Sequence, residues 1–189
     1  MTSYRNRRTC LVIFCLILFW PHTVIGQEAR LTNIIVTNNR DDLLLYLSVE
    51  GAFTDEMKEA VLSGVPASFS FFITLYHARN LWFDKKIAGL RLTHSIKYDN
   101  LKKEFVVKRS WENDKARVTK SFNEAQTLMA NIDSLKILPL TGLEKGGQYQ
   151  VQAKAELSKL TLPFYLHYVL FFVSLWDFET DWYTIDFIY

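Results

Sequence analysis

The sequence contains only two cysteines in 189 residues, and both, Cys10 and Cys15, lie within its first 26 positions. If that leading stretch is removed on export, the rest of the chain has no cysteine. A disulfide framework, thiol catalysis and a cysteine-ligated metal centre are then excluded. The 163 residues that follow position 26 are enough for one domain with a hydrophobic core of its own.

The sequence also lacks the short motifs that carry much enzyme chemistry. It has no G-x-S-x-G and no glycine-rich phosphate loop, and Gly146-Gly147 fits a turn better. The later histidines, His77, His94 and His167, form no HxH or HExxH arrangement. We expect a strand-end His77, a core-face His94 with a hydrogen-bond partner, and a half-buried His167. We therefore expect a non-enzyme with no catalytic residue and no cofactor.

The first 26 residues have the pattern of a secretory signal. A positive beginning is followed by an apolar run over residues 11–20, which is too short to span a bilayer comfortably. We predict cleavage before Gln27 and a periplasmic location; the alternative is an uncleaved N-terminal anchor. The positive charges are Arg5, Arg7 and Arg8.

Net charge gives no sign of a nucleic-acid partner. The whole chain has a formal net charge of +2, and loss of the three arginines of the leading segment would bring it to about −1. The basic character of the sequence thus belongs partly to the segment that we expect to be removed.

Alternation of apolar and polar residues dominates the rest of the chain. Such alternation places one face of a strand in a core and the other face in water. Short polar turns between these stretches, such as YDNLKK, favour antiparallel pairing. The apolar positions that alternate are Leu43, Leu45, Leu47 and Val49; Phe69, Phe71, Ile73 and Leu75; Leu90, Leu92, His94, Ile96 and Tyr98; and Tyr149, Val151, Ala153, Ala155 and Leu157.

Two helices interrupt the strands. One begins at Thr54 and ends at Gly64, and the other begins at Ser121, which forms a predicted capping box with Glu124. We therefore predict a mainly β fold, an antiparallel two-sheet, immunoglobulin-like sandwich with two or three short helices. It would form a single domain over residues 27–189.

Several motifs recur in the order expected of one bacterial family. They are GVPASFSFFITLYHARNLWFD, IKYDNLKKEFVV, SFNEAQTLM, GGQYQVQAKAEL and LPFYLHYVLFFVSLWDFETDW. Together they resemble the family called domain of unknown function 4390, over nearly all of the chain after the signal. The resemblance implies a secreted periplasmic protein with no established activity. It also implies a gene beside that of a nitrogen-regulation-type sensor histidine kinase, a possible partner.

The segment 160–176 contains no Asp, Glu, Lys or Arg, and three interpretations of it are open. A membrane span is the weakest, because Pro163 leaves a helix of about 13 residues, roughly 20 Å, against a hydrocarbon core near 30 Å. Full burial is the second. Contact with a membrane interface or a partner is the one we favour, because tyrosine and tryptophan suit half-wet boundaries. The contact residues would be Tyr165, Tyr168, Phe172 and Trp176.

Three acidic residues follow this segment, namely Asp177, Glu179 and Asp181. In a regular strand their spacing would place all three carboxylates on one face, where they could hold a hard cation such as calcium. The alternative, which we favour, is an ordinary solvated face. We therefore predict no metal site and keep these three residues only as a weak candidate.

Aromatic residues and lysine pairs mark two turns. We expect Tyr76, Trp82 and Phe83 to close one end of the sandwich; if exposed, Trp82 and Phe83 would belong to the interaction surface. The pairs Lys85-Lys86 and Lys102-Lys103 could hold the protein near anionic lipid, although solvated loops carry such pairs routinely.

These observations predict an accessory or interaction module at the cell envelope. It would contact the inner membrane or a membrane sensor kinase through residues 160–176. The alternative is a soluble periplasmic carrier of a small apolar ligand. The sequence gives no sign of the oligomeric state.

Overall fold

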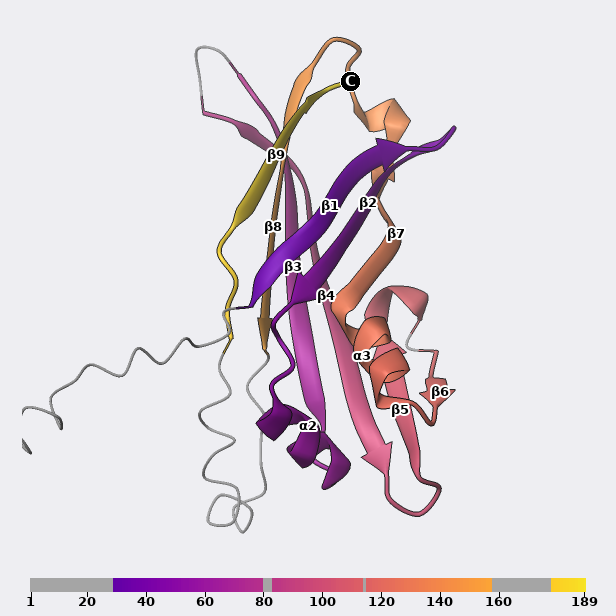
Figure 1. The fold of residues 1–189 in the computed structure, drawn as a ribbon. Coiled ribbons are helices and arrows are strands. Elements are labelled where there is room, and N and C mark those ends of the chain that lie inside the picture. The colour runs from indigo at the N-terminus through magenta and orange to yellow at the C-terminus, as the bar shows by residue number, and fades with distance from the viewer. Residues whose placement is uncertain (1–28, 80–82, 114, 158–177) are drawn as a thin grey trace, which may run out of the picture.

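The computed structural model describes residues 29–79, 83–113, 115–157 and 178–189. Two antiparallel sheets face each other, and two α-helices lie at their ends (Figure 1). The predicted fold class, a mainly β two-sheet sandwich with two helices, is confirmed.

The larger sheet has six strands in the order β6-β5-β4-β3-β8-β9. All of its neighbouring strands are antiparallel. Its strands are β3 (Ala67–His77), β4 (Lys85–Asp99), β5 (Glu104–Arg109), β6 (Arg117–Thr119), β8 (Gln148–Leu157) and β9 (Tyr183–Ile188).

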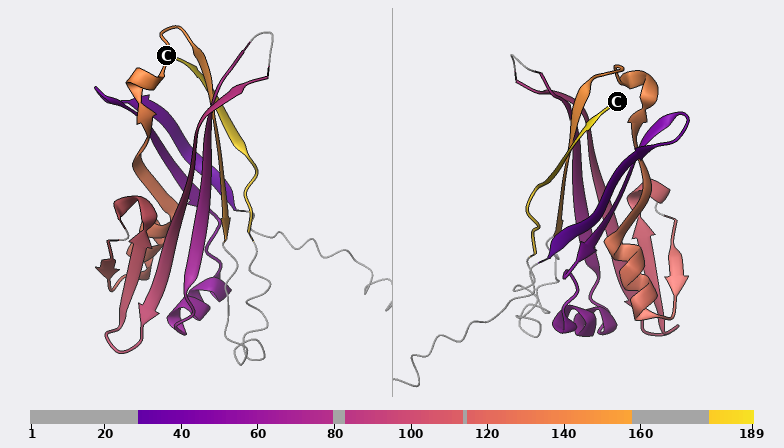
Figure 2. Two further views of the ribbon diagram at one scale, coloured as in Figure 1. Left: turned by 180° about the vertical axis from the view of Figure 1, so that it is seen from behind. Right: turned by 45° about the horizontal axis from the view of Figure 1, so that its top comes forward.

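The smaller sheet has three strands in the order β1-β2-β7 and packs across the larger one (Figure 2). Both of its pairings are irregular, with register shifts in β1 between Thr32 and Ile35 and in the β2–β7 pair. Its strands are β1 (Arg30–Asn38), β2 (Asp42–Glu50) and β7 (Asn131–Pro139).

The core lies between the two sheets and is formed by the inward residues of the alternating strands. Phe69, Phe71 and Ile73 of β3 are buried in it, and Tyr149 of β8 is buried farther along, opposite the end of β3. Of the outward residues between them, Phe72 is half-buried, whereas the small Ser70 is buried. The period-two pattern therefore predicted the inward face of β3 and β8 correctly, since successive strand residues point to opposite faces.

Both helices begin at the predicted caps. Helix α2 (Asp55–Leu62) has Thr54 as its N-cap, and helix α3 (Phe122–Ala130) has Ser121. The predicted capping box at α3 is only half formed. Ser121 accepts from the Glu124 N–H, but the Glu124 carboxylate accepts from the Thr119 hydroxyl rather than from the Ser121 N–H.

Replacing Thr54 with alanine should lower the free energy of unfolding by about 1 kcal/mol. The Thr54 Oγ1 accepts a hydrogen bond from the Met57 N–H at 3.3 Å, and alanine leaves that donor without its cap. Thr54→Ser, which keeps the hydroxyl, is the control. Urea unfolding that ranks the serine and alanine variants as equal would show that the hydroxyl does not cap α2.

Turns and connections divide the molecule into two ends. Helix α2 and the β4–β5 turn lie at the lower end in Figure 1, which we call the α2 pole, and β8 ends between this pole and the middle of the molecule. The pairings agree, because Phe69 at the beginning of β3 pairs with Leu157 at the end of β8. The β1–β2 and β3–β4 turns and the C-terminus lie at the opposite end.

Among the described residues, no helix is both long enough and apolar enough to cross a membrane.

Candidate functional site

The two residues that flank segment 158–177 are bonded to each other where β8 ends. The Leu157 N–H donates to the Phe178 carbonyl at 2.9 Å, and the Thr180 N–H donates to the Ala155 carbonyl at 2.9 Å. Phe178 also packs edge-on against Phe69, with ring centroids 4.9 Å apart. The chain therefore leaves β8 and returns to the sheet at one point on one side of the molecule.

The β4–β5 turn at the α2 pole presents an apolar side chain among cations. Leu101 is 96% exposed, and Lys102 and Lys103 follow it, both exposed. An isolated exposed leucine is ordinary, but a leucine at the tip of a hairpin and next to two lysines is a typical arrangement for contact with an anionic interface.

The turn holds this side chain outward because Asp99 fixes its backbone. The Asp99 carboxylate accepts from the Leu101 N–H at 2.9 Å and from the Lys102 N–H at 3.1 Å. The Lys103 N–H donates to the Asp99 carbonyl at 2.8 Å, and Lys103 has a φ of 57°. The hydrogen bond from Lys102 is the main cause that lowers the pKa of Asp99, so the carboxylate stays charged and bonded.

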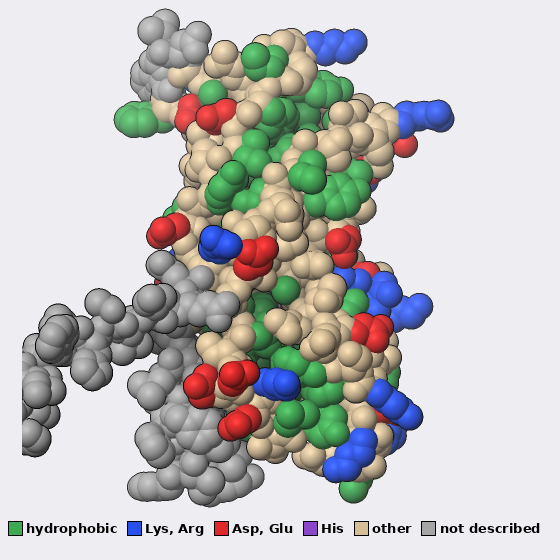
Figure 3. All heavy atoms as spheres, in the orientation of Figure 1, with side chains coloured by type: hydrophobic (Ala, Val, Ile, Leu, Met, Phe, Trp, Pro, Cys, Tyr) green, Lys and Arg blue, Asp and Glu red, His purple; other side chains and the backbone are tan. Residues whose placement is uncertain are grey.

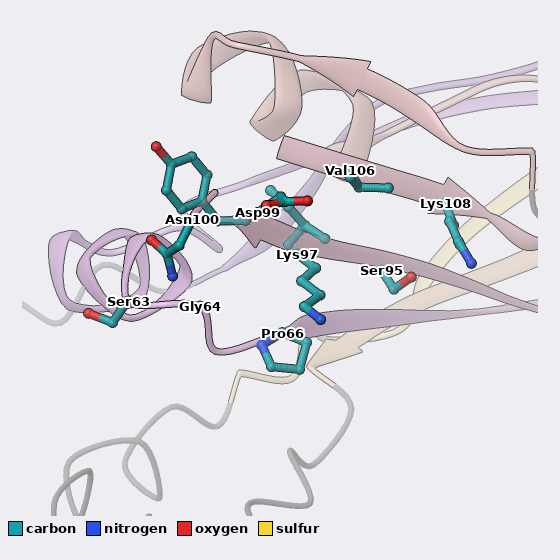
Figure 4. A pocket seen from close by; sticks show the side chains of 11 residues that line it. Ser63, Gly64, Pro66, Ser95, Lys97, Asp99, Asn100, Val106 and Lys108 are labelled. Carbon is teal, nitrogen blue, oxygen red and sulfur yellow. The ribbon is translucent and has the colours of Figure 1, made fainter. Parts of the chain in front are cut away.

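A groove of about 750 Å³ runs beside this turn on the outer face of β4 and β5. Figure 4 shows Lys97 reaching across it toward Pro66, with Ser95 and Lys108 further along. Its lining is about half polar, and it includes two ammonium groups and the Asp99 carboxylate. Such a lining suits a phosphate or carboxylate better than an apolar molecule. The residues that line it are Ser63, Gly64, Pro66, Ser95, Ile96, Lys97, Tyr98, Asp99, Asn100, Val106 and Lys108.

Charge at the α2 pole is uneven. Figure 3 shows basic side chains at the lower right, on the side of the β4–β5 turn, and acidic ones at the lower left, near α2. Helix α2 has Asp55 and Glu56 in its first turn and an exposed Glu59 in its second. An anionic surface would therefore attract the β4–β5 turn and repel the first turn of α2.

His94 is fully buried, as expected of a core-face histidine. Its Nδ1–H donates to the Met129 carbonyl at 2.7 Å, and its ring lies between those of Phe71 and Trp111, at 4.7 and 4.6 Å. Nε2 is buried without a hydrogen-bond partner among the described residues. Burial lowers the pKa of His94 to about 4, and the charge of Arg109 lowers it further, against the opposing effect of the Met129 bond.

Arg109 is the other buried polar residue of this region. It is only 4% exposed, and its guanidinium donates to both carboxylate oxygens of Glu112, at 2.6 and 3.2 Å. Its guanidinium carbon also lies 5.0 Å from the Trp111 ring centroid. Arg109 therefore has a bonded partner, whereas the buried Nε2 of His94 has none among the described residues.

The other histidines hold no site among the described residues. His77 is half-buried at the end of β3 and stacks on Tyr149 with centroids 4.8 Å apart, in agreement with the strand-end prediction. His167 lies outside the described residues. No group of three His, Cys, Asp or Glu side chains within residues 29–79, 83–113, 115–157 and 178–189 could hold a metal ion.

The acidic residues after the apolar segment do not follow a regular strand. Glu156 pairs with Glu179, but Ala153 pairs with Tyr183, so the pairing shifts by one residue between them. The Glu179 carboxylate accepts from the Lys154 ammonium group instead of facing a shared cation site. Glu179 and Asp181 are both exposed, as on the solvated face that we favoured, and Asp177 lies outside the described residues.

The predicted aromatic residues are not gathered at one place. Phe83 is 87% exposed, whereas we expected it to be buried, and Tyr76 is half-buried. Phe83 follows the β3–β4 turn at the end opposite the α2 pole. Trp82 lies outside the described residues, as do Tyr165, Tyr168, Phe172 and Trp176.

Sequence reasoning did not single out Leu101. It lies in a turn rich in polar residues, and a single leucine gives no periodic signal. The lysine pair beside it was noted only as a weak indication. A signal was available in the order Asp-Asn-Leu-Lys-Lys, because an aspartate that caps the turn forces the third residue outward.

Fold and site together define a two-sheet antiparallel sandwich with a basic, apolar-tipped β4–β5 turn, two strands away from the point where an uncharged segment leaves β8. The chain belongs to the family described as Domain of unknown function (DUF4390), whose model matches residues 26–186. No curated protein and no solved structure matches it.

Proposed function

We propose that this protein is a non-enzymatic, extracytoplasmic module that docks through its α2 pole on an anionic membrane surface of the cell envelope. The observation that carries the proposal is the hydrogen bond between Leu157 and Phe178. It places the two residues that flank segment 158–177 next to each other, so the chain leaves the sheet and returns to it at the same point. A single membrane crossing would instead separate the two flanking residues by about 30 Å.

The β4–β5 turn adds a second contact, at the α2 pole. Burying the exposed Leu101 side chain in an interface would contribute about 2 kcal/mol, and each lysine near an anionic surface about 1 kcal/mol. Lys97 and Lys108 in the groove could receive lipid phosphate groups behind the turn.

The test is binding of the purified full-length gene product to vesicles of phosphatidylcholine with and without phosphatidylglycerol. We expect binding to the anionic vesicles only. The double variant Lys102→Ser/Lys103→Ser should bind about 30-fold more weakly, because two charges of about 1 kcal/mol each are lost. Sedimentation of the vesicles measures the bound fraction.

Lys85→Ser/Lys86→Ser is the matched control. It removes the same two charges from an exposed pair at the opposite end of the sandwich, where β4 begins. This variant should bind like the unaltered protein. Equal losses from both lysine pairs would show that net charge, rather than the α2 pole, drives binding, and the proposal would be wrong.

A membrane sensor kinase is the alternative partner. The protein would then bind neither kind of vesicle, and it would be retained by the immobilised periplasmic part of such a kinase. That result would identify the kinase, rather than lipid, as the partner of the α2 pole. The carrier of an apolar ligand gains no support from the groove beside the β4–β5 turn, since that groove has two lysines and polar side chains in its lining.

A further inference from the structure

We propose that two copies of this protein pair through strand β9, edge to edge, and join their six-stranded sheets into one continuous sheet. Strand β9 is the terminal strand of the larger sheet and pairs with β8 on one side (Figure 1). No described strand pairs with its other side. An edge strand of this kind exposes backbone donors and acceptors that a further strand can use.

The other three sheet edges carry features that discourage such pairing. Strand β1 has a bulge at Asn33, whose φ is 51°, and β7 has Ser134 at a φ of 57° as well as an exposed Lys136. Strand β6 is only three residues long. Bulges, lysines and short length are the usual means by which proteins protect an edge.

Strand β9 has none of these protective features. Its sequence, YTIDFI, has no lysine, proline or glycine, and its six residues pair with β8 without a register shift. The exposed large apolar side chains near this edge are Trp182, Tyr183 and Ile188, at 52%, 46% and 70% exposure. The contrast with the other edges indicates that β9 has a partner.

The open edge presents the backbone groups of the even-numbered residues. The Tyr189 N–H donates to the Gly147 carbonyl at 3.1 Å, so odd-numbered residues bond toward β8. Because the direction alternates along an antiparallel strand, Thr184, Asp186 and Ile188 direct their N–H and C=O groups away from β8.

The sequence of β9 is complementary to itself in one register. If two copies meet antiparallel with Ile185 opposite its own symmetry mate, Tyr183 faces Phe187 and Trp182 faces Ile188 across the interface. Thr184 then faces Asp186, and their outward backbone groups form the new ladder. Aromatic and aromatic–aliphatic pairs of this kind stabilise antiparallel strands.

The nearest alternative register is disfavoured by charge. A shift that places Asp186 at the two-fold axis sets two carboxylates directly opposite each other, which destabilises a strand pair. Asp186 already accepts a hydrogen bond from Gln150 at 2.9 Å, which holds it on the outer face of the sheet. We therefore expect one register, centred on Ile185. The two-fold axis would place the two α2 poles at opposite ends of the dimer. Pairing through β9 therefore does not depend on docking of both poles on one membrane.

The register is tested by cross-linking in a full-length gene whose Cys10 and Cys15 are replaced by serine, so that an introduced cysteine is the only one. Ile185→Cys should form a disulfide-linked dimer under mild oxidation, because residues opposite each other lie about 5 Å apart. Asp186→Cys, whose two copies would be offset along the strands by more than disulfide reach, should stay uncross-linked. The reverse result, or no cross-link from either variant, would overturn the proposal.

Sedimentation velocity tests the edge itself. Thr184→Pro removes an outward N–H and leaves the bonds to β8 in place, and it should weaken self-association about 10-fold. Thr184→Val, which keeps the N–H, should associate like the unaltered protein. The proposal would be overturned if the protein stays monomeric up to about 0.5 mM. It would also be overturned if the protein stays monomeric and binds an extended apolar peptide along β9 instead of a second copy.

Discussion

Replacing Phe69 with alanine should lower the free energy of unfolding by about 3–5 kcal/mol, the largest single-residue effect we expect. Phe69 is fully buried, and its ring contacts two others, Phe53 at 5.0 Å and Phe178 at 4.9 Å. The cavity left by the substitution would open where β3, the segment before α2 and the segment before β9 meet. Urea unfolding followed by tryptophan fluorescence measures the change.

Phe72→Ala is the matched control, because it removes the same side chain from the other face of the same strand. Phe72 is half-buried on the outside of the sheet, with the Arg91 guanidinium carbon 5.1 Å from its ring centroid. Its loss should cost about 1 kcal/mol or less. Equal losses from the two substitutions would contradict the inward and outward faces of β3. Phe69→Ala also loosens Phe178, so it should weaken the junction where β8 ends.

The protein should lose about 3 kcal/mol of stability between pH 6.5 and pH 4 because of His94 alone. In the folded state the pKa of His94 is about 4, below the value of 6.5 for an exposed histidine. Between these values the unfolded chain binds the proton and the folded chain does not. The contribution is therefore fully present above pH 6.5 and is lost as the pH falls toward 4.

His94→Phe isolates this effect. The variant keeps a ring between Phe71 and Trp111 but cannot be protonated. The pKa values of Asp99 and Glu112 are also lowered, by hydrogen bonds from Lys102 and Arg117 first of all, so both proteins lose further stability in stronger acid. The difference between the two unfolding free energies, measured in steps from pH 7.5 to pH 4.5, should shift by about 3 kcal/mol. Parallel curves would contradict a neutral, buried His94.

The sequence predicted those parts of the fold that a period of two determines. Strand β8 alternates strictly and β3 does so except at Phe72, and each apolar position expected inside is buried. Strand β7 could not be foreseen in this way, because the left-handed Ser134 interrupts its alternation. In a regular strand Trp182 would share the face of Phe178, but the one-residue shift in the β8–β9 pairing moves it to the outer face, where the Lys154 ammonium group lies over its ring.

The candidate site was predicted only in part, for a similar physical reason. The uncharged segment 160–176 is visible in the composition, but the bond between Leu157 and Phe178 depends on strands that are far apart in sequence. The exposure of Leu101 follows from a turn whose geometry is set by Asp99. It indicates a contact surface only once the structure shows where this turn lies relative to segment 160–176. Juxtaposition of this kind is a property of the fold and not of either segment.

The central claim is tested most directly by measuring how deeply each end of the molecule inserts into the bilayer of an anionic vesicle. An environment-sensitive fluorophore would be attached to Leu101→Cys at the α2 pole, or to Phe83→Cys at the opposite end, in chains with serine at positions 10 and 15. Both native side chains are strongly exposed, so neither label should disturb the core. Docking through the α2 pole predicts a blue shift and quenching by lipid-chain quenchers for the label at 101 and none at 83. A blue shift at 83 alone, or none at either position, would contradict it.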